Sequence, residues 1–260
     1  MSDAADNLSA IQQQFRRQAE VYSTMPVVTD PKLLDFMVSI SDVGKSDRVL
    51  DVASGPGYVA MAFAPHCARV VGIDATDRLV ARARAGAERV SLNNIAFVLG
   101  DVEHMAFAPR SFDLATCRFA FHHFPRAASV IAEMSRVTRP RARMVIVDML
   151  ASEDPARADY HNAVERLCDP SHARALPASE FERIFAHQDF EVTFKQTRKT
   201  SYRLEDWIAH GAPSAENTAK IFAMMEASID DDKSALDVRR EQGTIWFSHT
   251  GVSYVIRKRA

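Results

Sequence analysis

Cysteine is scarce in this chain, with three residues among 260. Cys67, Cys117 and Cys168 are widely spaced and odd in number, and no CxxC pair or Cys/His metal-binding spacing occurs. Disulfide frameworks and structural zinc sites need such pairs or clusters. The sequence therefore predicts neither, and a reducing, cytoplasmic location is the default expectation.

The chain also lacks an excess of charge of either sign, and it lacks long apolar runs. Its formal net charge is −2, and no basic patch with interleaved aromatic residues stands out, which argues against a nucleic-acid partner. No apolar run approaches the roughly 18 residues that a membrane-spanning helix needs, and the first residues are polar, unlike a signal peptide. We therefore expect neither a nucleic acid nor a membrane among the partners.

The chain is long enough for one large α/β domain, or for a core domain with a cap. Leu8, Ile11 and Phe15 begin a series of apolar residues at steps of three and four, which predicts an amphipathic helix. A second helix is expected from Pro31, a favourable first-turn residue. Because both helices precede the first strand, residues 1–45 are expected to form an N-terminal helical cap.

Residues 46–150 alternate between strand patterns and helix patterns. Repeats of strand, helix and strand predict a mostly parallel sheet with helices on both faces. The predicted core is thus α/β, Rossmann-like and doubly wound. The expected strands are residues 48–53, 69–74, 95–99, 113–118 and 142–148, and the expected helices are residues 57–65, 77–91 and 127–138.

The pattern changes after residue 150. Residues 151–260 are expected to complete a seven-stranded sheet and to carry inserted substrate-cap helices at about 153–176 and 203–240. The last strand region, about residues 245–258, predicts an antiparallel C-terminal hairpin that turns at Thr250-Gly251.

A turn of small residues, 54–57, follows the first predicted strand. Gly55 and Gly57 allow the backbone to approach a ligand where a Cβ atom would clash. Asp74 ends the second strand, where a carboxylate can accept hydrogen bonds from both hydroxyls of a ribose. The spacing G-x-G-x-x-A at residues 55–60 also fits the NAD(P) fingerprint, so the turn alone leaves the nucleotide cofactor open.

Four stretches together resemble the class I S-adenosylmethionine (SAM)-dependent methyltransferases, and most closely the group related to ubiquinone/menaquinone-biosynthesis methyltransferases. The resemblance covers roughly residues 13–148 and, weakly, the C-terminal hairpin. One departure is Ala53, where the broad family has glycine. The four stretches are residues 51–57, Asp74, residues 100–105 and residues 112–124.

The resemblance implies that SAM is the cofactor, and it implies roles for single residues. Asp51 would lie near the cationic amino end of the methionine moiety, and Asp74 would bind the ribose hydroxyls. Asp101 would accept from the adenine amino group, while the Val102 N–H donates to a ring nitrogen. The cofactor-binding residues expected on this basis are Asp51, Ala53, Ser54, Gly55, Gly57, Asp74, Ala75, Thr76, Asp101, Val102 and Arg118.

Three histidines are candidates for a catalytic base, because the unperturbed pKa of histidine is near neutral. His122 leaves the fourth strand at its carboxyl end, and His161 and His172 belong to a segment rich in hydrogen-bonding side chains. Each can equally be a structural histidine with satisfied hydrogen bonds. We expect no metal site, because a set of His161, Glu165 and His172 lacks the H-E-x-x-H pattern.

The leading functional hypothesis is transfer of a methyl group from SAM to a carbon, oxygen or nitrogen atom of a small-molecule acceptor, by in-line displacement. Positioning and exclusion of water would supply much of the rate. An NAD(P)-dependent oxidoreductase is the first alternative, but it gives Asp101 no role. The second is a non-catalytic SAM-binding protein on the same fold. A monomer and a homodimer are both compatible with the sequence.

Overall fold

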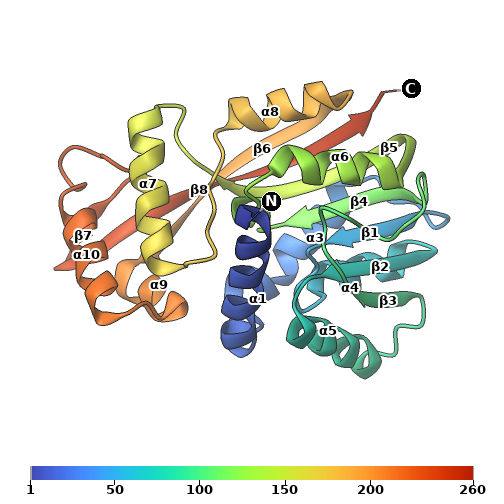
Figure 1. The fold of residues 1–260 in the computed structure, drawn as a ribbon, viewed down its shortest axis with the longest axis horizontal. Coiled ribbons are helices and arrows are strands. Elements are labelled where there is room, and N and C mark those ends of the chain that lie inside the picture. The colour runs from blue at the N-terminus through green and yellow to red at the C-terminus, as the bar shows by residue number, and fades with distance from the viewer. Residues whose placement is uncertain (1, 260) are drawn as a thin grey trace.

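The structure is a computed structural model that describes the backbone of residues 2–259 and the side chains of residues 8–259. The described residues form an eight-stranded sheet in the order β3-β2-β1-β4-β5-β8-β6, with the short β7 paired to β8 (Figure 1). Strands β1 to β5 are parallel, and β8 is antiparallel to β5, β6 and β7. The strands are β1 Arg48–Val52, β2 Arg69–Asp74, β3 Ile95–Leu99, β4 Phe112–Arg118, β5 Thr138–Leu150, β6 Phe190–Arg203, β7 Arg239–Glu241 and β8 Thr244–Lys258.

The expected doubly wound α/β fold is confirmed, with seven strands on the main path of the sheet and β7 as an eighth. The inner strands are nearly continuous apolar runs, and in β1 only Arg48 is exposed. Burial on both faces requires such runs, because helices cover both sides of a parallel sheet.

Helices pack on the two faces of the sheet in separate apolar clusters. One cluster joins the sheet to α3 (Pro31–Ile40), α4 (Tyr58–Phe63) and α5 (Asp77–Arg89). The other joins it to α6 (Ala127–Val137) and α8 (Ala178–His187). Short elements connect these helices, namely α2 Pro26–Thr29 and the 3₁₀ turns η1 Ala64–His66 and η2 Phe121–His123.

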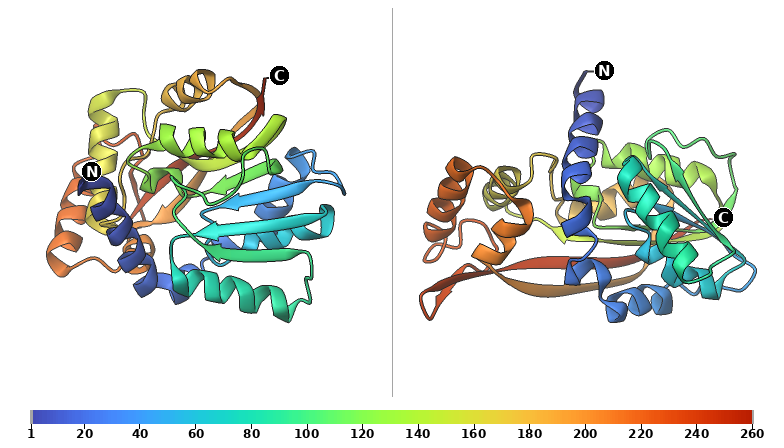
Figure 2. Two further views of the ribbon diagram at one scale, coloured as in Figure 1. Left: turned by 45° about the vertical axis from the view of Figure 1, so that its right-hand side comes forward. Right: turned by 90° about the horizontal axis from the view of Figure 1, so that it is seen from below.

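A second lobe extends from the core on the long strands β6 and β8. It contains α7 (Pro155–Cys168), α9 (Leu204–Gly211) and α10 (Ala215–Glu226), and it has a third apolar cluster of its own. Figure 2 shows β6 and β8 running from the core into this lobe without interruption. The lobe is therefore attached through the sheet itself.

The predicted hairpin turn at Thr250-Gly251 is wrong, because both residues lie inside the continuous strand β8. Gly251 pairs with Met149 of β5 on one side and with Arg198 of β6 on the other. Partners on both sides hold this residue extended and override the local turn signal. The tight turn lies earlier, at Gln242 and Gly243, between β7 and β8.

Helix α1 (Ser2–Tyr22) stands between the core and the lobe (Figures 1 and 2). Gln12 Nε2 donates to Ala75 O at the end of β2, over 3.1 Å. On its other side, Gln18 Nε2 donates to Gly211 O of α9, over 3.0 Å. No helix within residues 2–259 combines the length and the apolar character needed to cross a membrane.

Candidate active site

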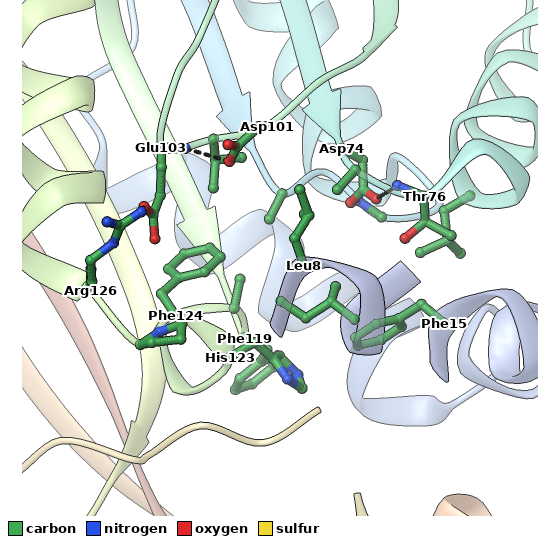
Figure 3. A pocket seen from close by; sticks show the side chains of 18 of the residues that line it. Leu8, Phe15, Asp74, Thr76, Asp101, Glu103, Phe119, His123, Phe124 and Arg126 are labelled. Carbon is green, nitrogen blue, oxygen red and sulfur yellow. Dashed lines mark hydrogen bonds and ion pairs between the residues drawn. The ribbon is translucent and has the colours of Figure 1, made fainter. Parts of the chain in front are cut away.

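A cavity of about 410 Å³ opens at the carboxyl ends of the parallel strands, under α1. Figure 3 shows its side chains around one space, with Asp74 and Thr76 on one side and Glu103 and Arg126 on the other. This edge is where open α/β sheets bind ligands. The strand-end residues expected from the sequence that line it are Ala53, Gly55, Asp74, Ala75, Thr76, Asp101 and Val102.

The turn after β1 winds through left-handed backbone. Gly55 has a φ of 53° and Gly57 a φ of 86°, values that favour glycine. A Cβ atom on Gly57 would lie 2.6 Å from Cζ of Phe97, so this position also lacks room for a side chain. Ala53 adopts a φ of 54° without being glycine, which stores strain at the point where the chain departs from the family pattern.

Asp74 holds this turn in place through its carboxylate. The backbone N–H groups of Gly55 and Thr76 each donate to it over 2.8 Å. The side chain is buried, and burial raises its pKa, while these N–H groups oppose the shift. The carboxylate therefore lines the cavity in a fixed orientation.

Asp51 lies deeper, beside a second cavity of about 20 Å³ that shares Tyr22, Ala53 and Gly55 with the first. Its carboxylate accepts hydrogen bonds from Thr116 Oγ1 (2.9 Å) and Ala60 N (3.1 Å). Burial raises the pKa of Asp51 to about 7.

Two buried polar atoms in the smaller cavity have no hydrogen-bond partner among the residues that the structure describes. They are Ser54 Oγ and Arg118 Nη1. The other terminal nitrogen of Arg118 donates to Val28 O over 2.6 Å, which fixes the guanidinium group beside the cavity. Unsatisfied buried donors are costly, so this pair is poised to bind a polar ligand group.

Asp101 lines the large cavity and is absent from the lining of the smaller one. It accepts from the Glu103 N–H over 2.9 Å and contacts His104 Nδ1 at 2.9 Å. Val102 is buried next to it. Asp101 and Val102 thus both line the large cavity.

Aromatic side chains of α1 form the roof of the large cavity. Phe15 makes edge-to-face contacts with Tyr22, at a ring-centroid distance of 5.3 Å, and with His123, at 5.1 Å. Burial raises the pKa of the Tyr22 hydroxyl to about 12, so this group stays neutral at physiological pH. The part of the roof that Phe15 and Tyr22 form is therefore aromatic and uncharged.

His122 and His123 point in different directions. His122 Nδ1 contacts Asp148 Oδ1 at 2.6 Å, and His122 lines neither of the two cavities. Burial lowers the pKa of His122, but the Asp148 carboxylate outweighs burial and the net shift is upward. His123 lines the large cavity, and burial, aided by His122, lowers the pKa of His123 to about 4.

The other two predicted bases also lie outside both cavities. His172 Nε2 lies 2.7 Å from Asn162 Oδ1, which also accepts from the Ala175 N–H over 2.7 Å. Burial lowers the pKa of His172 to about 2, so the ring is neutral and its Nε2 donates. His161 lies on α7 beside Glu165 and His249.

The sequence pointed to His122 as a candidate base, but it is the neighbouring His123 that lines the cavity, and the part played by Asp148 was not predicted. That carboxylate accepts from the N–H groups of Ala120, Phe121 and Met149, in addition to its contact with His122. An acid at the end of a buried strand is the signal that identifies it, because such a group needs partners.

Comparison with known proteins gives a consistent result. The methyltransferase-domain family matches residues 50–146. YcgJ, an uncharacterized methyltransferase of Bacillus subtilis (strain 168), is 30% identical over 228 residues, which cover 88% of this chain and 90% of the relative. The crystal structure of the B. subtilis YcgJ protein has a TM-score of 0.82 at 29% identity, covering 87% of this chain and 98% of that chain. A demethylmenaquinone methyltransferase of Thermotoga maritima is 33% identical over 143 residues, 52% of this chain and 60% of the relative.

The sheet order and the cavity at the strand ends define a Rossmann-like enzyme of the nucleotide-binding kind. The chain belongs to the class I SAM-dependent methyltransferases and resembles the ubiquinone/menaquinone-biosynthesis group. The family predicted from the sequence motifs is thereby confirmed.

Proposed function

We propose that this enzyme binds SAM across the two adjoining cavities and transfers its methyl group to a small molecule. The observation that carries the proposal is the set of polar groups around the smaller cavity. Asp51 offers an acceptor for an ammonium group, while Ser54 Oγ and Arg118 Nη1 are buried donors with no partner among the described residues. Such a set complements the amino and carboxylate groups of a methionine moiety.

The remaining cofactor contacts follow along the large cavity. Asp74 would accept from the ribose hydroxyls, with Ala75 and Thr76 beside it. Asp101 and the Val102 N–H would bind the adenine, and the turn through Ala53, Gly55 and Gly57 would pass beneath the cofactor.

Bound SAM supplies an activated methyl group on a sulfonium, and the chain supplies alignment and a dry environment. Phe15 and Tyr22 cover the site, and the Tyr22 ring can make a cation–π contact with a positive centre below it. In this proposal residues 1–45 act as a cap, residues 46–150 as the cofactor-binding core, and residues 151–260 as the rest of the sheet with inserted substrate-cap helices. The lining of the two cavities ends at Arg126, so these helices would act from outside the cavities.

Where the acceptor atom must lose a proton, we assign the role of base to His123. It lines the cavity and is neutral at pH 7, since its pKa is lowered to about 4. The low pKa makes it a weak base, so the role requires an acceptor whose own proton is acidic. His122, held by Asp148, would position its neighbour, and His161 and His172 lie outside the cavity. Phe119 and Phe124 line the space near His123, which favours an acceptor with an apolar or aromatic body.

The test is calorimetric titration of the purified enzyme with S-adenosylhomocysteine and, separately, with NADH. Asp74→Ala should weaken S-adenosylhomocysteine binding by about 1–3 kcal/mol, the cost of leaving polar partners unpaired. Glu88→Ala, an exposed acid on α5, is the matched control and should leave binding unchanged. Binding of NADH in place of S-adenosylhomocysteine, or equal binding by both variants, would overturn the assignment.

A further inference from the structure

A second polar cluster lies in the lobe, away from the two cavities. His161 and Glu165 are four residues apart on one face of α7, and His249 reaches them from β8. All three side chains are buried. The sequence offered His172 as the third member of such a set and predicted no metal site, whereas the structure brings His249 to the other two residues.

The distances fit a single ion. The candidate ligand atoms of the three residues lie within 4.8 Å of one another. Glu165 Oε1 is 2.7 Å from His249 Nε2 and 3.4 Å from His161 Nε2. Ligands at about 2.0–2.1 Å around a tetrahedral zinc ion are separated by about 3.3 Å, so small movements convert this cluster into a coordination site.

A simple ion pair between Glu165 and His249 explains only part of the cluster. His161 is 1% exposed, and its Nε2 makes no hydrogen bond to any residue that the structure describes. A buried ring nitrogen directed at a carboxylate that already contacts another histidine needs a further partner. A cation between the three groups would satisfy all of them.

The donor types of the cluster also favour a cation. Glu165 places a carboxylate, buried in the lobe, between two imidazoles, which are neutral when they bind a metal ion. A buried carboxylate needs a positive partner, and a bound cation would supply it.

We propose that His161, Glu165 and His249 form a binding site for a divalent transition-metal ion, with Zn²⁺ as the occupant. Two imidazoles and one carboxylate are the donor set of many three-ligand zinc sites, which keep a fourth position for water or a substrate atom. The rings of Tyr202 and Phe247, with centroids 5.3 Å and 5.1 Å from that of His249, supply an aromatic shell around the ion. This inference does not depend on the SAM site.

The experiment loads the full-length protein with Zn²⁺, removes excess metal by dialysis and measures the zinc content per chain. The unmodified protein should retain one equivalent. His161→Ala, Glu165→Gln and His249→Ala should each weaken Zn²⁺ binding by about 100-fold or more, because even residues behind the ligands change affinity by about 10–100-fold. His187→Ala, an exposed histidine on α8, is the matched control and should retain the ion.

Two further measurements keep the result unambiguous. S-adenosylhomocysteine binding by His249→Ala tests whether this variant is folded, and it should be unchanged. If the variants do not fold, Co²⁺ added to the unmodified protein decides, because tetrahedral Co²⁺ gives intense visible absorption that the hydrated ion lacks. Absence of retained zinc and of this spectrum, or equal zinc content in folded variants and control, would overturn the proposal.

Discussion

The two polar regions of this molecule are built in different ways. At the strand ends of the core, Asp74 and Asp148 accept hydrogen bonds mainly from backbone N–H groups close to them in the fold. In the lobe, Glu165 depends on the imidazoles of His161 and His249, and His249 is 84 residues away along the chain. Backbone donors are present whatever the local side chains are, whereas the lobe cluster exists only if three particular side chains meet.

The largest effect is expected from removing Asp148, the most thoroughly bonded carboxylate of the core. Asp148→Ala leaves the N–H groups of Ala120, Phe121 and Met149 and the ring of His122 without their shared partner. We expect the free energy of unfolding to fall by about 3–5 kcal/mol, measured by urea denaturation. Asp148→Asn retains one oxygen acceptor and should lose less stability than Asp148→Ala. Equal losses of stability in the two variants would contradict the role of this carboxylate as a shared hydrogen-bond acceptor.

Asp51 should make stability depend on pH. Its folded-state pKa is about 7, raised from 3.8 by burial, so the protonated form is favoured by folding. Its contribution is fully present below about pH 4 and is lost as the pH rises through 7. Between pH 5 and pH 8 the loss amounts to about 2–3 kcal/mol. In urea denaturation at pH 5 and pH 8, Asp51→Asn should not show this loss of stability. Identical pH profiles for the variant and the unmodified protein would count against the prediction.

His172 should produce the opposite dependence. Burial lowers its folded-state pKa from 6.5 to about 2, so the unfolded chain binds a proton first when the pH falls. The stabilising contribution is present above about pH 6.5, and about 2 kcal/mol is lost between pH 7 and pH 5. His172→Gln, which can still donate to Asn162, should flatten the acid side of the denaturation profile. An unchanged slope would show that the ring is protonated in the folded protein.

The smallest effect concerns the strained turn. Ala53 has a φ of 54°, where a Cβ atom costs about 1 kcal/mol or more. Ala53→Gly removes this strain but increases the entropy of the unfolded chain, so a net gain of about 0.5 kcal/mol is expected. Ala62→Gly in α4, whose backbone is helical, should instead lose about 1 kcal/mol. Thermal denaturation of the two variants should give shifts of opposite sign.

The success of sequence-based prediction follows the same division between the two regions. The core strands, the glycine turn and the place of Asp74 at the end of β2 were predicted correctly, because each depends on a short local pattern. The continuity of β8 was not predicted, because the extended conformation at Gly251 depends on pairing with β5 on one side and β6 on the other. His249 was not identified for the same reason, because only the packing of β8 against α7 brings it to Glu165.

The same strand has a mechanical consequence. Strand β8 pairs with β5 in the core and continues into the lobe beside β6, and its pairing with β6 is regular from Val255 to Trp246. A hinge between core and lobe would have to break backbone hydrogen bonds of this ladder. Opening by rotation of two rigid bodies is therefore energetically unfavourable in this architecture. Helix α1 is held to the core partly by exposed contacts such as the ion pair of Arg16 with Asp77, which are individually weak. A shift of α1 is therefore the less costly way to widen the cavity.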